Sequence, residues 1–400
     1  MICLMPNCAF LSETSRMIQI CGGLTERGAE ARIATHGGMH EAVLQSAGVA
    51  YDIVGPRMDA VRSLRFLADT IGIGDPGQSM YPADEMRAYV HAEADYFRRN
   101  SVEAVVTGFT LTTLLSTRIA GVPLVTEHAG SFIPPLLERS QRLPPPRLYL
   151  SVFDALADEH GLPRIPSFPA LLLGDLSLVT EAPEIYGLGQ EEMRAWRPIG
   201  ATCWPTTRFE YTGPIFAKLD FPVPSAVEAA LERHGPIVYV AITSSSAEVT
   251  REIVREAAGT GAEVIVAATI HDLSDLGGPR VTVAGILPSH RIMPRVDLAV
   301  TAGGQGSLQC AMAAGTPVIG IPLQPEQAAN VRWLQAAGAA RSLPLGELGS
   351  GALPALIREM TTEPSYRTAA RAIRSVYAGR NGAALSAEAI LSYLARGRPH

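Results

Sequence analysis

Short runs of aliphatic and β-branched residues alternate along the chain with segments in which apolar residues recur at helical spacing. In the first half these runs predict strands at ICLM (2–5), ARIAT (31–35), AVVT (104–107), LVT (124–126) and LSLVT (176–180). In the second half they predict strands at IVYVAI (237–242), EVIVAA (263–268), VTVAG (281–285), LAVT (298–301) and PVIGI (317–321). Strands that alternate with helices are typical of βα units, so the sequence predicts α/β domains with parallel sheets.

The first helix is predicted from Ser15 to Arg27, because Met17, Cys21 and Leu24 fall on one face and Gly28 follows its end. A proline-rich stretch at 202–226 then interrupts the alternation and indicates an extended connection. We therefore expect three successive segments, namely an N-terminal domain at 1–213, a linker at 214–224 and a C-terminal domain at 225–380.

The two halves share a pattern at a fixed offset of 194 residues. AVVTGFTLTTLLSTRIAGVPLVT (104–126) aligns with LAVTAGGQGSLQCAMAAGTPVIG (298–320), and each reads strand, loop, helix, Gly-x-Pro, strand. An internal repeat explains this match, and so does the general pattern of βαβ units. Under either explanation the sequence predicts two Rossmann-like domains.

No charged side chain occurs between Leu298 and Pro325, a length that would suit a transmembrane helix. Three glycines inside TAGGQGSLQC (301–310) break any such helix. We instead predict a short helix capped by Ser307 and ended by Gly315, followed by a strand that begins at Pro317. The run therefore indicates a buried strand–loop–helix–strand, and we expect no stable membrane span.

Composition narrows the function classes. Hydrophobic residues make up 47% of the chain and charged residues 18%, which is typical of soluble globular proteins of two or three domains. The net charge of −6 is spread along the chain and argues against nucleic acid as a partner. Five cysteines without a CxxC pair and an N-terminus interrupted by Glu13 and Arg16 indicate a cytoplasmic protein without a signal peptide, a disulfide framework or a bound metal.

A glycine-rich loop that opens a helix suits an anion, because backbone N–H groups and the helix dipole both favour negative charge. GGQGS (303–307) fits that description, although a tight turn without a ligand explains it equally well. The next helix is predicted to begin near Pro325 and carries Glu326 and Asn330 on one face, where they suit hydroxyl recognition. Glu326 as a solvated first-turn residue is the alternative. In AITSSS (241–246), the serines either bind phosphate or cap the following helix.

These residues carry a resemblance. PIVYVAITSSS (236–246) and VTVAGILPSHRIMPRVDLAVTAGGQGSLQCAMAAGTPVIGIPLQPEQAAN (281–330) resemble the C-terminal half of family 1 GT-B glycosyltransferases, and within them the bacterial enzymes that act on macrolides and aromatic polyketides. The resemblance implies a GT-B fold, in which two Rossmann-like domains face across a cleft and a final segment at 381–400 crosses back to the first domain. It also implies a nucleotide-sugar donor on the C-terminal domain and a small-molecule acceptor on the N-terminal domain.

Carried over residue by residue, the resemblance implies a donor site. The implied roles are Leu287 and Pro288 at the nucleobase, Ser244 with Ser245 and the loop of Ala302, Gly303, Gly304, Gln305, Gly306 and Ser307 at the diphosphate, Gln309 at the ribose, and Glu326 with Gln327 at the sugar hydroxyls. The donor is a UDP- or TDP-sugar used as co-substrate, so no further cofactor is expected.

The chain also departs from the family pattern. The histidine that deprotonates the acceptor is missing from NCAFLSETSRM (7–17), its supporting aspartate is replaced by Gly108, and a diphosphate-binding histidine is replaced by Ala302. Three explanations stay open at this point: Glu13 or His128 replaces the base, the acceptor needs little deprotonation, or the protein is a non-catalytic partner of another enzyme. A sugar-nucleotide epimerase is a further alternative. We expect an inverting glycosyltransferase with an atypical base, and a homodimer is left open.

Overall fold

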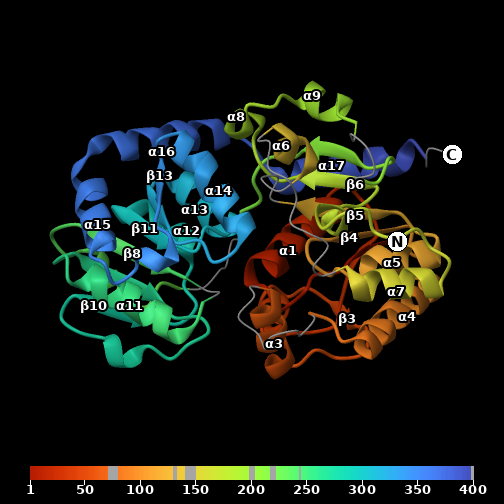
Figure 1. Cartoon of the computed structure of the whole chain (residues 1–400), viewed down its shortest axis with the longest axis horizontal. Helices are drawn as coiled ribbons and strands as arrows, with labels where there is room; N and C mark the ends of the chain where they lie inside the picture. The colour runs from red at the N-terminus through yellow and green to blue at the C-terminus, as the bar shows by residue number, and fades with distance from the viewer. Residues whose placement is uncertain are drawn as a thin grey trace. The chain divides into compact units, whose positions relative to one another are not determined.

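A computed structural model describes residues 1–70, 80–128, 133–139, 150–197, 203–216, 222–242 and 245–397. Ser244 lies outside these residues. The chain forms two compact units, one of residues 1–215 together with 381–400 and the other of residues 216–380. Each unit is a parallel sheet between helices (Figure 1). Two α/β units agree with the fold class predicted from the sequence.

The sheet of the first unit has seven strands in the order β3-β2-β1-β4-β5-β6-β7, and all neighbours run parallel. The strands are β1 (Ile2–Leu4), β2 (Ala31–Thr35), β3 (Tyr51–Ile53), β4 (Ala104–Thr107), β5 (Leu124–His128), β6 (Leu176–Val179) and β7 (Arg208–Tyr211). The central strands β1 and β4 are buried along their whole length, as expected for parallel strands covered on both faces.

Helices cover this sheet on both faces. They are α1 (Leu11–Thr25), α2 (Ala42–Ser46), α3 (Ala60–Thr70), α4 (Ala83–Arg99), α5 (Thr113–Ala120), α6 (Pro134–Arg139), α7 (Ser151–Glu159), α8 (Pro183–Tyr186), α9 (Gln190–Ala195) and α17 (Gly382–Ala395). The C-terminal helix α17, drawn in blue in Figure 1, packs on α1 through Ala387, Ile390 and Tyr393 in one apolar cluster with Met17 and Ile20. This burial of apolar surface holds the end of the chain in the first unit.

The sheet of the second unit has six parallel strands in the order β10-β9-β8-β11-β12-β13. They are β8 (Ile237–Ala241), β9 (Glu263–Ala267), β10 (Val281–Ala284), β11 (Leu298–Thr301), β12 (Val318–Gly320) and β13 (Ala340–Ser342). The helices are α10 (Ser225–Leu231), α11 (Ala247–Ala258), α12 (Ser289–Ile292), α13 (Gln305–Ala314), α14 (Pro325–Ala336), α15 (Ala352–Thr362) and α16 (Pro364–Tyr377).

The predicted repeat corresponds to the same βαβ position in both sheets. β4, α5 and β5 of the first unit match β11, α13 and β12 of the second, and both helices end at a left-handed glycine. Gly121 has φ of 72° and Gly315 has φ of 73°, a conformation that glycine adopts without strain.

Several predicted boundaries were wrong. α1 begins at Leu11 rather than Ser15, and α13 begins at Gln305 with Gly304 as its N-cap, so Ser307 lies inside the first turn and caps nothing. β7 occupies part of the stretch predicted to be an extended connection. Its position at the sheet edge explains the error, because an edge strand tolerates nearby prolines.

No helix among the residues that the structure describes is both long enough and apolar enough to cross a bilayer.

Candidate active site

In both sheets the strand order changes direction at one point, between β1 and β4 in the first unit and between β8 and β11 in the second. Ligands of open α/β sheets bind beyond the carboxyl ends of the strands at such points. Glu13 lies just after β1, and the turn of Gly303 and Gly304 lies just after β11. The fold therefore places both predicted site segments at ligand-binding edges of their own sheets.

Glu13 lies in the first turn of α1 and is only 2% exposed. Its Oε1 accepts hydrogen bonds from three backbone N–H groups, those of Asn7 (3.2 Å), Gly108 (3.1 Å) and Phe109 (2.7 Å). Its Oε2 is buried and has no hydrogen-bond partner among the described residues. Burial raises the pKa of Glu13 to about 8, although the backbone hydrogen bonds and the charge of Arg16 oppose the rise. The carboxyl is therefore mostly protonated at pH 7.

Gly108 makes room for this carboxyl. A Cβ at position 108 would lie 2.8 Å from Cγ of Glu13, closer than real Cβ contacts allow. The glycine that follows β4 and the glutamate on α1 are therefore coupled, because any side chain at position 108 would have to displace the Glu13 carboxyl.

Arg16 and Glu127 form a buried ion pair next to Glu13 that the sequence analysis did not predict. The Nε of Arg16, one turn after Glu13, donates to Oε2 of Glu127 at 2.8 Å. Glu127 comes from β5, and its Oε1 accepts a hydrogen bond from the hydroxyl of Thr180 at 2.7 Å. Because the partners are 111 residues apart, no local pattern could have revealed the pair.

His128, the second predicted base, is the last residue of β5 and is 7% exposed. Burial lowers its pKa to about 4, so the imidazole is neutral at pH 7. Arg16 further lowers the pKa of His128, and Glu127 opposes it. The two candidate bases thus lie in the field of the same ion pair.

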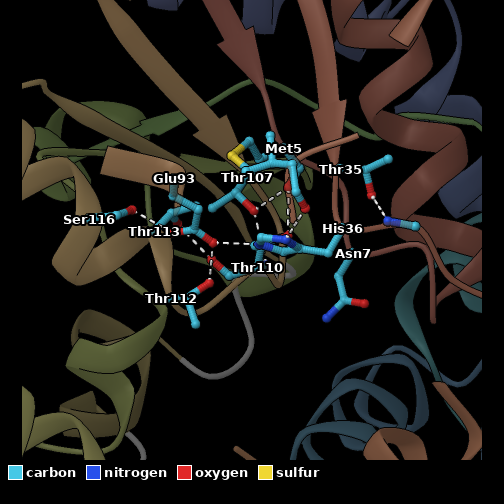
Figure 2. A network of polar contacts seen from close by, with 12 residues as sticks. Met5, Asn7, Thr35, His36, Glu93, Thr107, Thr110, Thr112, Thr113 and Ser116 are labelled. Atoms are coloured by element: carbon cyan, nitrogen blue, oxygen red, sulfur yellow. Dashed lines mark hydrogen bonds and ion pairs between the residues drawn. The ribbon is translucent and has the colours of Figure 1, made fainter. Parts of the chain in front are cut away.

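A second polar network lies behind this edge, around His36 and Glu93 (Figure 2). The ring of His36 donates from Nδ1 to the carbonyl of Val54 at 2.8 Å, and its Nε2 lies 2.7 Å from Oε1 of Glu93. Glu93, from α4, also accepts hydroxyl hydrogen bonds from Thr112 and Ser116, both at 2.5 Å. Every one of these side chains is buried, so the network ties α4 and α5 to the loop after β2.

The loop after β2 has the same turn as the loop after β11. The hydroxyl of Thr35 accepts from the N–H of Gly37, and the hydroxyl of Thr301 accepts from the N–H of Gly303, both at 3.1 Å. Gly37 has φ of 86° and Gly303 has φ of 89°. A histidine sits inside the first turn, and Ala302 takes its place in the second.

The turn after β11 requires glycine. A Cβ at Gly303 would lie 2.6 Å from Cγ2 of Val331 and 3.0 Å from the carbonyl oxygen of Gln327. α13 then begins at Gln305, and its first intrahelical hydrogen bond runs from the N–H of Leu308 to the carbonyl of Gly304 at 3.1 Å. The N–H groups of Gln305, Gly306 and Ser307 therefore point out of the start of the helix, which favours an anion there.

Asn330 connects this turn to Glu326. Its Nδ2 donates to the carbonyl of Gly303 at 3.2 Å and to Oε1 of Glu326 at 2.5 Å. Gln327 is buried, and its Oε1 accepts from the N–H of Leu323 at 2.8 Å. The glycine turn and the first turn of α14 thus form one hydrogen-bonded unit that carries a half-buried carboxylate.

The other predicted donor residues of the second unit lie in varied settings. Gln309, Leu287 and Pro288 are buried. The hydroxyl of Ser245 lies 2.6 Å from that of Thr250, which directs it into the start of α11, and Ser246 is the residue that caps α11 by accepting from the N–H of Val249. For Ser245 and Ser246 the geometry is therefore that of a helix start.

Within the described residues, no group of three or more histidine, cysteine, aspartate or glutamate side chains is arranged to hold a metal ion. All five cysteines are free thiols.

Several known proteins resemble this chain in sequence or in fold. Residues 251–384 match the profile of the erythromycin biosynthesis protein CIII-like, C-terminal domain. A PGL/p-HBAD biosynthesis glycosyltransferase of Mycobacterium tuberculosis is 25% identical over 316 residues, which cover 75% of this chain and 73% of the relative. The 4'-demethylrebeccamycin synthase of Lentzea aerocolonigenes is 30% identical over 240 residues, covering 57% of this chain and 53% of the relative.

The fold is also that of a solved glycosyltransferase, VinC, in complex with dTDP, with a TM-score of 0.68, 16% identity and coverage of 99% of this chain and 100% of that one. Two parallel α/β units and the glycine turn, together with these relatives, define a GT-B glycosyltransferase. More particularly, most of its second unit lies in the match to the CIII-like C-terminal domain, and the chain is similar to glycosyltransferases of natural-product biosynthesis.

Proposed function

We propose that the protein transfers a sugar from a UDP- or TDP-sugar to a small-molecule natural-product acceptor, with inversion at the anomeric carbon. One observation carries the donor half of the proposal: the hydrogen-bonded unit of Gly303, Asn330 and Glu326 puts a carboxylate beside an anion-binding helix start. A nucleotide-sugar carries both a diphosphate and a sugar, so it needs an anion site at the helix start and a carboxylate that binds its hydroxyls.

In this proposal the donor's diphosphate rests on the N–H groups of Gln305, Gly306 and Ser307, and the dipole of α13 stabilises its charge. Glu326 and the amide of Gln327 bind sugar hydroxyls, Gln309 the ribose, and Leu287 with Pro288 the nucleobase. A relative in fold, VinC, was solved with dTDP, which supports a TDP-sugar as the first donor to test.

Ala302 bears on the leaving-group step, because its methyl group donates no hydrogen bond to the departing diphosphate. The N–H groups and the helix dipole then supply the electrostatic stabilisation in this unit. Since the acceptor oxygen attacks the anomeric carbon as the diphosphate leaves, no covalent sugar–enzyme bond forms and the configuration inverts.

On the acceptor side we propose Glu13 as the atypical base. A carboxylate whose pKa is raised to about 8 by burial is a far stronger base than an ordinary glutamate, and it is competent once ionised. His128 is the alternative base, but a neutral imidazole whose pKa is lowered to about 4 by burial accepts a proton less readily. The free thiols suit a reducing compartment, which supports the predicted cytoplasmic location. The homodimer also stays a prediction.

Calorimetric titration of the purified protein with UDP and with TDP, using ADP as a control, tests the donor half. We expect saturable binding of UDP or TDP. Mass spectrometry of the protein with sugar donors and a panel of natural-product acceptors tests transfer. Absence of binding to both pyrimidine diphosphates would overturn the proposed donor, and release of an epimerised free sugar without acceptor would replace transfer by epimerisation.

A further inference from the structure

Arg16 is a buried arginine whose hydrogen-bonding capacity is mostly unused. It is 9% exposed, and a single hydrogen bond, from Nε to Glu127, is found for its side chain among the described residues. A guanidinium has five N–H donors in a planar fork, so the four on Nη1 and Nη2 have no protein acceptor there. Neither nitrogen is among the buried side-chain atoms without a partner, so both reach solvent and are open to water or a ligand.

Arg16 lies at the edge of the sheet where ligands of such folds bind. Arg16 lies one helical turn after Glu13 on α1, and Glu127 lies next to His128 at the end of β5. These segments follow or end β1 and β5, on either side of β4, at the carboxyl edge of the sheet. The side chain is therefore placed where an acceptor bound to this unit would lie.

The charged groups at this edge balance one another, so they do not repel an incoming anion. Arg16 and Glu127 cancel each other, while burial keeps Glu13 mostly protonated and His128 neutral at pH 7, because their pKa values are raised to about 8 and lowered to about 4, respectively. An incoming acidic oxygen would thus meet the Nη1 and Nη2 groups of the guanidinium and one carboxylate, that of Glu127, which is already paired. Arginine matches such oxygens with two parallel N–H···O bonds.

We propose that Arg16 binds an anionic oxygen of the acceptor, so that the substrates of this enzyme carry a carboxylate or an ionised phenol near the reacting hydroxyl. This rests on the proposed function, since it names the acceptor class of that site. Arg16 acts as a specificity residue, and Glu127 orients its fork from the Nε side.

Two naphthalene probes separate the charge from the ring: 1-hydroxy-2-naphthoic acid, which is anionic at pH 7, and its neutral methyl ester. Binding of each is measured by calorimetry without donor, so the result is independent of whether sugar is transferred. We expect the wild-type protein to bind the acid roughly tenfold or more tightly than the ester, the range expected for a charge-assisted pair. A panel of phenols without a carboxylate, titrated above and below their own ionisation, distinguishes the two sources of the anionic oxygen.

The decisive variant is the double substitution Arg16→Gln with Glu127→Gln, which removes both charges and leaves no buried ion without its partner. We expect normal thermal unfolding, unchanged TDP binding, and loss of the preference for the acid. Arg16→Lys serves if the double variant does not fold, because it keeps a cation beside Glu127 but lacks the planar fork. Arg27→Gln, on the same helix, is the control, since the Arg27 guanidinium bonds the carbonyl of Gly23.

Equal affinity of the wild-type protein for acid and ester would overturn the proposal, and so would a double variant that keeps the preference. If the wild-type protein did not bind TDP, that result would count against the proposed function. It would not affect the comparison of the acid with the ester.

Discussion

The backbone N–H of Gly108 donates to Oε1 of Glu13 at 3.1 Å, and the missing side chain of Gly108 provides the space in which that carboxyl lies. The absence of a side chain after β4 thus determines where the carboxyl of Glu13, on α1, can lie. This relationship explains why a glycine stands where the family resemblance leads one to expect an aspartate. With Glu13 in place, a second acidic side chain does not fit.

Replacing Gly108 by alanine should displace the Glu13 carboxyl, because the new Cβ would lie 2.8 Å from its Cγ. We expect a loss of about 1–3 kcal/mol in the free energy of unfolding, together with reduced turnover. The control is Gly22→Ala within α1, where an added Cβ meets nothing within 4 Å and should stabilise the helix slightly. Denaturant unfolding and steady-state kinetics measure both effects, and equal behaviour of the two variants would contradict the coupling.

Glu13→Gln tests the proposed base directly. Turnover of the wild-type enzyme should rise as the pH increases through about 8, because the carboxylate forms there, and the glutamine variant should lose turnover while keeping its affinity for TDP. Unchanged turnover in the variant would rule out Glu13 as the base.

The raised pKa of Glu13 also predicts how the free energy of unfolding depends on pH. Folding favours the protonated carboxyl, so this contribution to stability is complete below about pH 4.5 and is lost as the pH rises through about 8. The unfolding free energy of the wild-type protein relative to Glu13→Gln should therefore fall between these pH values. Chemical denaturation at several pH values measures it, and a pH-independent difference would show that Glu13 titrates normally.

The histidines His40 and His128 should make the first unit labile to acid. Burial lowers the pKa of each to about 4, whereas an unfolded histidine titrates near its usual 6.5. Between those values the unfolded state binds more protons, so the free energy of unfolding should fall as the pH decreases from about 6.5 to about 4. Each of His40→Gln and His128→Gln should remove up to about 1.4 kcal/mol per pH unit of that slope. NMR titration that finds either imidazole protonated near pH 6.5 would contradict this.

The two glycines of the turn after β11, which is the proposed donor site, should respond very differently to alanine. Gly303→Ala places a Cβ against Val331 at a φ of 89°, and we expect a cost of about 2–4 kcal/mol together with loss of TDP binding. Gly304 has φ of −65° and open space around its Cβ position, so Gly304→Ala should cost less than about 1 kcal/mol. Thermal unfolding of the pair tests whether the turn is as tight as the geometry indicates.

Asn330→Ala should separate the glycine turn from Glu326, because the Asn330 amide hydrogen-bonds both. We expect the KM for the sugar donor to rise roughly tenfold, which corresponds to the loss of a hydrogen bond to a charged group. Gln335→Ala is the control, since this amide on the same helix accepts only from the N–H of Ser342 among the described residues. A KM that does not change in Asn330→Ala would remove Glu326 from the proposed donor site.

The sequence by itself determined the class of fold and the position of the glycine turn after β11. Alternating apolar runs and helical periodicity are local signals, and the glycines of TAGGQG mark a turn whose conformation few other residues can adopt. The repeat at an offset of 194 residues also proved to be structural, because it corresponds to the same βαβ position in each sheet.

Only the tertiary structure decided the protonation and the contacts of the polar residues in the first unit. Glu13 could be recognised in the sequence, but its raised pKa depends on burial and on amides from Asn7, Gly108 and Phe109. The pairs Arg16–Glu127 and His36–Glu93 join residues that are 111 and 57 positions apart. Charge, burial and hydrogen bonding at such positions are set by which strands become neighbours, and a one-dimensional pattern contains no record of that pairing.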